Sequence, residues 1–215
     1  LEGTNIGPPM LVTLHLTGGR VDTVLAETRI LFDGVPAPLI YVSSTRSSAV
    51  VPYGVAGRVS TNLQVEYQTA KSATIAFRIA DSAPGIFTLD ASGRGPGAIL
   101  NQNYSVNSIG NAAPRGTWVM VYATGGGSVS PPVLDGSVTP NAEPLPRPLL
   151  PVSVTIGGRP AQVAYAGGAP GFVAGVLQLN VKIPEDLLLS GPTTVPIGIT
   201  IGGASSQPSV TVAVY

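Results

Sequence analysis

The sequence predicts an all-β protein made of two antiparallel β-sandwich domains in tandem. Three observations predict this class. The second half of the chain repeats the first, most apolar runs are short and end at turn residues, and no segment keeps a helical period. We expect the domains to span residues 1–82 and 83–215, with a small inter-domain hairpin belonging to the second domain.

The internal repeat is clearest around one hairpin. Residues 32–41 return as residues 156–165, with glycine, proline, alanine and tyrosine in register. The AVVP stretch at residues 49–52 is answered by VKIP at 181–184. Because each copy consists of short apolar runs between turns, the repeat indicates two copies of one β-module. Duplicated β-modules are typical of proteins built for reach or assembly, so the repeat favours a non-catalytic function.

In the first module, alternation and turn chemistry predict each element. Val12, Leu14 and Leu16 alternate with polar residues, as in a half-buried strand. Asp33-Gly34 between two apolar runs is a strong hairpin signal. The other strands expected here are residues 28–32, 39–42, 49–51, 63–67 and 74–79.

The second module is expected to repeat these strands, and three connections stand out. A helical turn is predicted at residues 184–189, where proline and two acidic residues precede leucines. Residues 98–101 and 104–106 are predicted to form the small hairpin, and residues 125–151 an extended, ordered loop. The expected strands are residues 118–122, 152–156, 162–165, 176–181, 195–201 and 210–215.

Composition excludes several classes of protein. Charged residues make up 10% of the chain and the net charge is zero, so a nucleic-acid interface is not expected. No apolar stretch is long enough for membrane insertion. With no cysteine, neither disulfides nor a thiolate metal site can form. A weakly charged surface with only two lysines favours an extracellular, secreted protein, and a start at Leu1 without methionine favours a processed or excised piece.

The sequence shows no catalytic, cofactor-binding or metal-binding pattern, so no enzymatic activity and no cofactor are expected. His15 is the only histidine and is read as a solvated strand residue without a nucleophile signature nearby. Glu185 and Asp186 are read as helix-capping acids, since adjacent helical residues point apart. The glycine-rich residues 93–97 are read as a turn, because the lysine and the helix of a phosphate loop are missing.

Two sequence features are compatible with an interaction with carbohydrate or with glycosylation. Trp118, Tyr122 and Phe172 could form a stacking platform for carbohydrate, although alternation favours Trp118 as a core residue or as a packing contact between modules. Asn103-Tyr104-Ser105 matches the acceptor pattern for N-glycosylation on a predicted hairpin turn.

Three longer stretches carry a family resemblance: residues 83–88 (APGIFT), 97–108 (GAILNQNYSVNS) and 166–175 (AGGAPGFVAG). They resemble an uncharacterised family of C-terminal domains in large secreted proteins of acidobacteria and related bacteria. The modules also look like the Ig-like IPT/TIG fold, in which a Gly-Gly-x-Pro-Ala hairpin opens the repeat. The resemblance covers nearly the whole chain and implies two tandem Ig-like sandwiches on a secreted or surface-attached protein. It implies no catalytic residues.

The first module departs from this pattern at its start. Residues 1–9 (LEGTNIGPP) resemble only the tail of the unit's opening strand, so the first sandwich is expected to lack most of that strand. A missing strand leaves unpaired amides and exposed apolar side chains, and a strand from another copy could fill the gap. The residues expected to take part in this assembly are Leu1, Ile6, Leu11, Val12, Leu14, Leu16, Val210, Val212, Val214 and Tyr215.

Two functions follow as expectations. The first is a structural subunit of an extracellular bacterial filament, which self-associates head to tail through strand pairing between subunits. The alternative is an adhesive or carbohydrate-binding module of a larger secreted protein, whose partners are surface glycans or other cell-surface proteins. A fragment cut at a convenient point would explain the short opening strand without any assembly.

Overall fold

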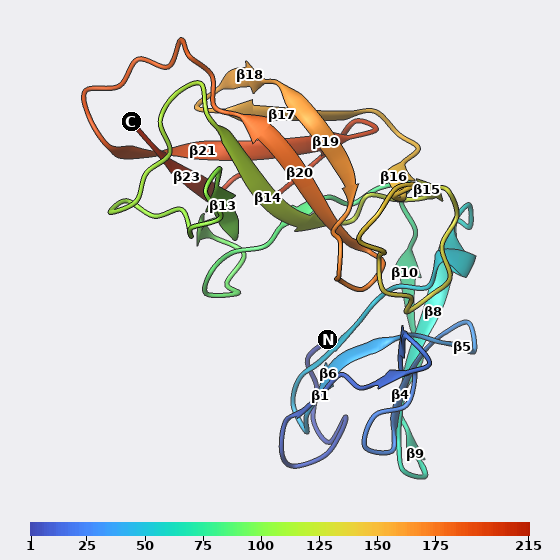
Figure 1. The fold of residues 1–215 in the computed structure, drawn as a ribbon. Helices are drawn as coiled ribbons and strands as arrows, with labels where there is room; N and C mark the ends of the chain where they lie inside the picture. The colour runs from blue at the N-terminus through green and yellow to red at the C-terminus, as the bar shows by residue number, and fades with distance from the viewer. The chain divides into compact units, whose positions relative to one another are not determined.

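The computed structural model describes all 215 residues, and the chain is all-β, with one 3-10 turn at Tyr53–Val55 (Figure 1). Its sheets are antiparallel apart from the pairing of β12 (Gly95–Pro96) with β23 (Val210–Val214), which is parallel. The prediction of an all-β class is confirmed.

The chain divides into two compact units. Unit 1 comprises Leu1–Asp81, Pro132–Glu143 and Pro170–Gly175, and unit 2 comprises the three remaining stretches, Ser82–Pro131, Pro144–Ala169 and Val176–Tyr215. Unit 1 thus contains two segments that come late in the chain, which a contiguous division of the sequence does not anticipate.

Hydrogen bonds tie the first late segment into unit 1. Val21 N–H donates to Gly136 O at 2.8 Å, and Tyr53 N–H donates to Asp135 Oδ1 at 2.8 Å. Gly136 has a φ of +74°, and a Cβ there would lie 2.9 Å from Val21 O, so this position requires glycine. The late segments are therefore fixed parts of unit 1.

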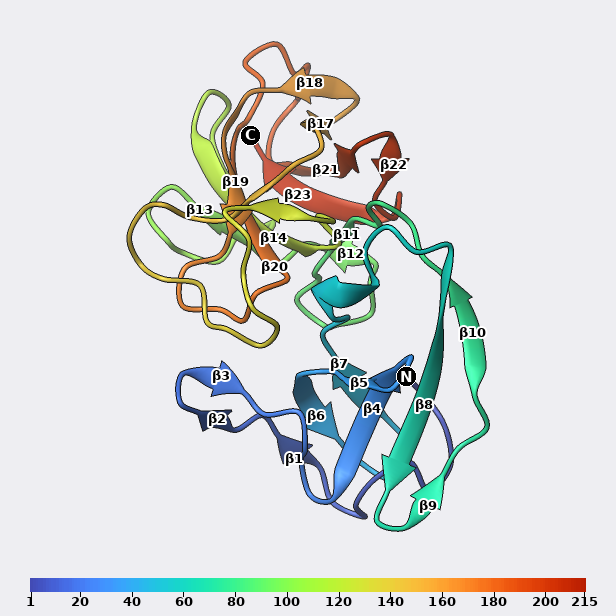
Figure 2. The ribbon, with the colours of Figure 1, turned by 90° about the vertical axis from the view of Figure 1, so that its right-hand side faces the viewer.

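Unit 1 contains a three-stranded sheet in the order β1-β6-β7, a five-stranded sheet in the order β10-β8-β4-β5 with β9 paired to β8, and the small β2-β3 pair (Figure 2). Its core, with Ile30 and Leu39 fully buried, takes residues from both larger sheets. The strands are β1 Val12–Thr13, β2 Leu16–Thr17, β3 Arg20–Val21, β4 Thr28–Phe32, β5 Val35–Pro36, β6 Leu39–Val42, β7 Ser47–Ala49, β8 Ser60–Tyr67, β9 Ala70–Lys71 and β10 Ile75–Arg78.

Unit 2 contains a sheet in the order β11-β14-β20-β19 with β13 paired to β14, and a second sheet in the order β12-β23-β21-β17-β18 with β22 paired to β21. A short β15-β16 pair lies within the long loop. A single apolar core contains residues of both large sheets. The strands not yet given are β11 Gly85–Ile86, β13 Ile99–Asn101, β14 Trp118–Thr124, β15 Val129–Ser130, β16 Arg147–Pro148, β17 Val152–Ile156, β18 Arg159–Ala161, β19 Val163–Gly168, β20 Val176–Lys182, β21 Thr193–Ile201 and β22 Ala204–Ser205.

Local sequence explains most of these elements. Asp33 and Gly34 both have positive φ, 50° and 82°, as the two-residue hairpin between β4 and β5 requires. The equivalent hairpin of unit 2 places Gly157 and Gly158 at 59° and 77°. The hairpin at residues 98–106 also forms, because Leu100 bridges Val106 while β13 pairs with β14.

Three predictions about local structure are wrong. Residues 184–189 form a turn at Glu185–Asp186 and no helix, because a single helical turn is costly to nucleate while Leu187 packs into the core of unit 2. Leu14 and Leu16 are exposed, because the expected strand is interrupted after Thr13: Leu14 lies outside β1, and Leu16 belongs to the separate β2-β3 pair. The third concerns the glycine-rich stretch, where Gly95–Pro96 pairs with β23 and so covers that strand's outer edge.

Candidate functional site

The outer edge of β7 in unit 1 is only partly covered. The Leu1 ammonium donates to Ser47 O at 2.9 Å, and Ser47 N–H donates back to Leu1 O at 3.0 Å. Further along the strand, Val50 N–H donates to Pro38 O at 2.9 Å, on the β6 side. Backbone hydrogen-bonding groups of successive residues in an antiparallel strand point to opposite sides, so the N–H and C=O of Ala49 point away from β6. On that side no strand pairs with β7.

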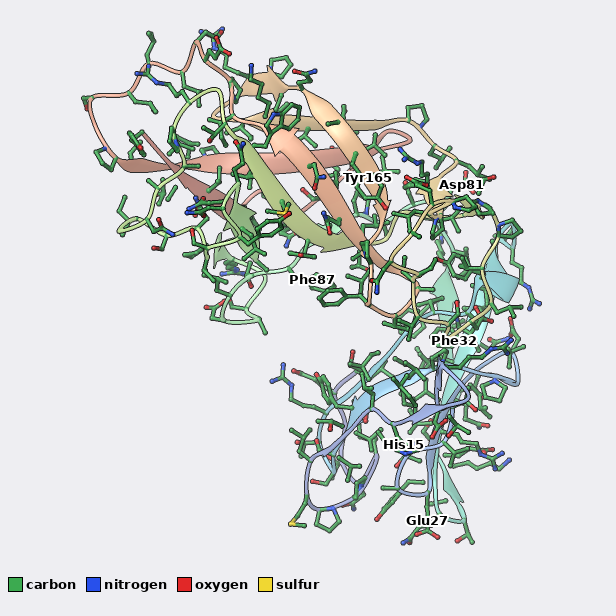
Figure 3. The ribbon with its side chains drawn as sticks, in the orientation of Figure 1. His15, Glu27, Phe32, Asp81, Phe87 and Tyr165 are labelled. Atoms are coloured by element: carbon green, nitrogen blue, oxygen red, sulfur yellow. The ribbon has the colours of Figure 1, made fainter.

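The pairing registers align this edge with unit 2, residue by residue. In both units the register shifts just before a tyrosine, and Tyr41 pairs with Ser48 as Tyr165 pairs with Asn180. Tyr165 is labelled on β19 in Figure 3. Strand β7 therefore corresponds to β20, and Ala49 corresponds to Val181.

Unit 2 shows what occupies the equivalent edge. Val181 pairs with Val119 of β14, which is fully buried. Leu1 corresponds to Val121. Leu1 pairs with Ser47, two residues before Ala49, and Val121 pairs with Leu179, two residues before Val181. Nothing in unit 1 pairs at the position that Val119 takes in unit 2. Strand β7 consequently lacks a partner over the stretch where β20 has one.

A second uncovered edge belongs to β10, in the other sheet of unit 1. Strands β8 and β21 align through a shared contact: Val65 N–H donates to Ser72 Oγ at 3.0 Å, and Ile199 N–H donates to Ser206 Oγ at 3.0 Å. From this alignment, Phe77 of β10 corresponds to Val212 of β23. Strand β23 is covered on its outer side by β12, whereas β10 is the outermost strand of its sheet (Figure 2).

The solvent exposure of apolar side chains shows the effect of leaving the edges of β7 and β10 unpaired. Corresponding positions that are buried in unit 2 are about half exposed in unit 1. The pairs are Leu1 at 44% against Val121 at 0%, Val51 at 50% against Ile183 at 0%, Ile75 at 54% against Val210 at 0%, and Phe77 at 45% against Val212 at 1%. Unit 1 therefore leaves uncovered the two strand edges whose counterparts in unit 2 are covered by segments 83–117 and 118–121.

We call this opening the open seam. It is a hollow of about 380 Å³ between the edges of β7 and β10. Arg78 is its only charged side chain, the Leu1 ammonium lies at its β7 edge, and Phe32 of β4, labelled in Figure 3, belongs to its apolar lining. The lining residues are Leu1, Phe32, Ser48, Ala49, Val51, Thr61, Leu63, Phe77, Arg78 and Ile79.

A carboxylate at the hairpin beside the open seam fixes one of its lining residues. Asp33 accepts hydrogen bonds from the backbone and side chain of Asn62 and from Thr61 Oγ1 at 2.8 Å, and it pairs with Arg58 at 2.9 Å. The Asn62 N–H, followed by the Thr61 hydroxyl, lowers the pKa of Asp33. This network orients Thr61 and joins the β4–β5 hairpin to β8.

The structure distributes the ten residues expected to take part in assembly. Leu1 lines the open seam, Ile6 packs against the core of unit 1, and Val12 lies on edge strand β1. Leu11, Leu14 and Leu16 are exposed on unit 1. Val210, Val212 and Val214 are buried in the core of unit 2, in a strand that pairs on both sides, and Tyr215 is half exposed after them. The last strand therefore stabilises unit 2 itself.

Two seam residues escaped the sequence analysis. Ile75 and Phe77 lie on a strand whose pattern resembles that of any half-buried strand, so neither was singled out. The signal that could have found them is their alignment with Val210 and Val212, which lie on a strand that pairs on both sides, whereas β10 pairs only with β8.

The aromatic residues considered for carbohydrate do not form one group. Trp118 and Tyr122 belong to unit 2 and Phe172 to unit 1. Of the two alternatives expected for Trp118, the core residue is wrong: Val119 and Val121 face the core, and Trp118 projects from the opposite face of β14, only partly buried. Alternation alone could not decide this, because apolar side chains occupy both faces. The other alternative, a packing contact between modules, stays a prediction.

The remaining candidates lie on the surface. His15 Nδ1 contacts Asp22 Oδ2 at 2.8 Å with its side chain 71% exposed. Glu185 pairs with Lys182 and Asp186 with Arg159. Asn103 is exposed on the hairpin turn, where its Oδ1 accepts hydrogen bonds from the Ser105 backbone and hydroxyl. Across the 215 described residues, no three His, Asp or Glu side chains gather as a metal-binding cluster.

Comparison with known proteins returned no match, either among protein-family models or among curated proteins. The chain forms no helix with the length and hydropathy needed to cross a membrane.

Proposed function

We propose that this chain is a non-catalytic, extracellular structural module, with two Ig-like β-sandwich domains in tandem, and that copies assemble head to tail into a surface filament. The open seam of unit 1 accepts a strand from the next copy. The observation that carries this proposal is the half exposure of four apolar residues whose counterparts in unit 2 are buried.

The open seam has the properties of a strand acceptor. The β7 edge offers the backbone N–H and C=O of Ala49, which an added strand would pair. Ile75 and Phe77 present apolar surface that the same strand would cover. A sheet edge with exposed apolar side chains and a single charged side chain favours pairing with another chain.

The donor that the fold leaves available is the segment from Met10 to Leu16. Met10 and Leu11 are exposed at 79% and 62%, and Leu14 and Leu16 are also exposed. The segment contains β1, whose outer edge is free because β1 pairs only with β6. It thus combines apolar side chains with unpaired backbone groups.

The positions of donor and acceptor favour a polymer over a closed dimer. Strands β1 and β7 are the two opposite edges of one three-stranded sheet. A contact between β1 of one copy and β7 of the next uses different surfaces on the two partners, so each added copy exposes the same free edges again. Such heterologous contacts propagate unless they close into a ring.

A peptide that fills the open seam tests the proposal. Residues 116–124 of this chain (GTWVMVYAT) include the strand that closes the equivalent position in unit 2. We expect the full chain to form concentration-dependent polymers in sedimentation velocity and negative-stain microscopy, and excess peptide to shorten them. A peptide with Val119→Asp and Val121→Asp is the matched control and should have no effect.

Three results would contradict parts of the proposal. A monodisperse monomer at all concentrations would overturn self-assembly. Binding of the peptide to a chain that stays monomeric would show that the open seam accepts a strand but does not join copies. Polymers that persist unchanged at saturating peptide would overturn the open seam as the contact between copies.

A further inference from the structure

The outer face of β14 carries large apolar side chains that the core does not use. Val119, Val121 and Ala123 point into unit 2, while Trp118 and Met120 alternate with them on the opposite face, partly exposed. Met120 pairs with Asn180 of β20, so an amide lies beside this apolar surface. The mixture of aromatic and amide groups suits neither a packed core nor an ordinary charged surface.

A hollow of about 250 Å³ opens on this face. Trp118 and Tyr104 supply aromatic rings, Gln102 and Asn180 supply amides, and none of the lining residues is charged. The lining is Gln102, Tyr104, Trp118, Val119, Met120, Ala164 and Asn180. Sites for drug-sized ligands measure about 300–1,000 Å³. This smaller hollow therefore suits a single ring of a neutral ligand that continues along the sheet.

Hydrogen bonds already made by the two amide oxygens orient the amide N–H groups. Gln102 Oε1 accepts from the Trp118 backbone N–H at 3.2 Å, and Asn180 Oδ1 accepts from Gln178 Nε2 at 2.9 Å. These bonds use the two amide oxygens and leave Gln102 Nε2 and Asn180 Nδ2 without a hydrogen-bond partner within the chain. Each NH₂ group carries two donors, so the hollow presents up to four directed donors beside an indole ring.

Tyr104 is held in place by the hairpin that carries it. It has a positive φ of 65° and is 75% exposed, although its N–H donates to Asn101 O at 2.8 Å. Asn101 is itself anchored, because its Nδ2 donates to Asn111 O and its Oδ1 accepts from Asn107. A strained, exposed aromatic residue on a braced turn is more typical of ligand contact than of folding.

We propose that this hollow binds a neutral saccharide. The apolar C–H face of a sugar ring would pack on Trp118, with Tyr104 at its side. The sugar's hydroxyl oxygens would accept hydrogen bonds from Gln102 Nε2 and Asn180 Nδ2. The uncharged lining disfavours anionic ligands. This binding site lies wholly within unit 2 and does not depend on strand addition at the open seam.

Trp118 makes the site directly observable, because it is the only tryptophan in the chain. Intrinsic fluorescence of the full chain is recorded during titration with cellohexaose, xylohexaose, mannohexaose and chitohexaose. The protein is made in a host that does not N-glycosylate, so that Asn103 beside the hollow stays unmodified. We expect a saturable change in emission with at least one hexasaccharide, and a rise in melting temperature with the same sugar.

Variants distinguish specific binding in the hollow from non-specific binding elsewhere on the surface. Asn180→Ala and Tyr104→Ala keep the fluorescent reporter and should each weaken the binding about 10-fold or more. Tyr215→Ala removes a half-exposed aromatic residue outside the hollow and should leave the affinity unchanged. Isothermal titration with Trp118→Ala should show no binding. If no hexasaccharide changes the emission up to millimolar concentration, or if Asn180→Ala and Tyr104→Ala bind like the parent chain, the proposal is overturned.

Discussion

Removing the exposed apolar residues of β10 should weaken self-association while leaving the monomer folded. The change is the double variant Ile75→Ser with Phe77→Ser. These side chains are 54% and 45% exposed, so about half of each is already in water. Fully burying an apolar side chain of this size is worth roughly 1.5–3 kcal/mol, so covering the exposed halves contributes about 1 kcal/mol each.

The two contributions together amount to about 2 kcal/mol, which corresponds to a dissociation constant roughly 30-fold weaker. Sedimentation velocity over a concentration series measures this shift directly. The matched control is Val24→Ser, which removes an apolar residue of unit 1 that is 51% exposed and does not line the open seam. We expect the control to assemble like the parent chain. Equal weakening by the control, or no weakening by the double variant, would refute the role assigned to the open seam.

Other predictions concern stability. Ile199→Ala in the fully buried core of unit 2 should cost about 2–5 kcal/mol of unfolding free energy in a denaturant titration. Asn107→Ala should cost about 1–3 kcal/mol by the same measurement, because it leaves the buried Ala213 N–H without its acceptor and removes one of the two donors to the Ala213 C=O. Acid should destabilise unit 1: the hydrogen bond from Lys71 lowers the pKa of Glu66, and the Asn62 N–H lowers that of Asp33. A depressed pKa stabilises the fold above the unfolded-state pKa, so the melting temperature should fall as pH drops below about 4 and through the folded-state values. A double variant with Glu66→Gln and Asp33→Asn should melt lower at neutral pH and lose this part of the acid dependence, and an unchanged acid slope would contradict the assignment.

Local chemistry is what the sequence predicts well here. Asp33-Gly34 identified its hairpin, because few dipeptides accept two positive φ angles in succession. The strand at 152–156 has the predicted bounds, since its apolar residues alternate between turn signals. The conformation of these elements depends on residues that are close in the sequence, so a short stretch of sequence is enough to predict them.

Contacts between residues that are far apart in the sequence cannot be predicted in this way. The face of β14 that enters the core could not be chosen, because large apolar or aromatic side chains occupy both faces, Trp118 and Met120 on one and Val119 and Val121 on the other. The exposure of Phe77 could not be read from β10 either, since it depends on a covering segment that unit 2 has and unit 1 lacks. The edge of β10, the second wall of the open seam, became visible only from the pairing registers.

The interleaving of the two units constrains the order in which the protein can mature during synthesis. Unit 1 draws on residues up to Gly175, which leave the ribosome long after Asp81. All residues of its apolar core precede Asp81, so the core can form early, while the hydrogen bonds from Gly136 and Asp135 are added only after most of the polypeptide has been translated. An expression product truncated at residue 81 would lack both late segments, and the nascent chain passes through the same incomplete state each time it is made.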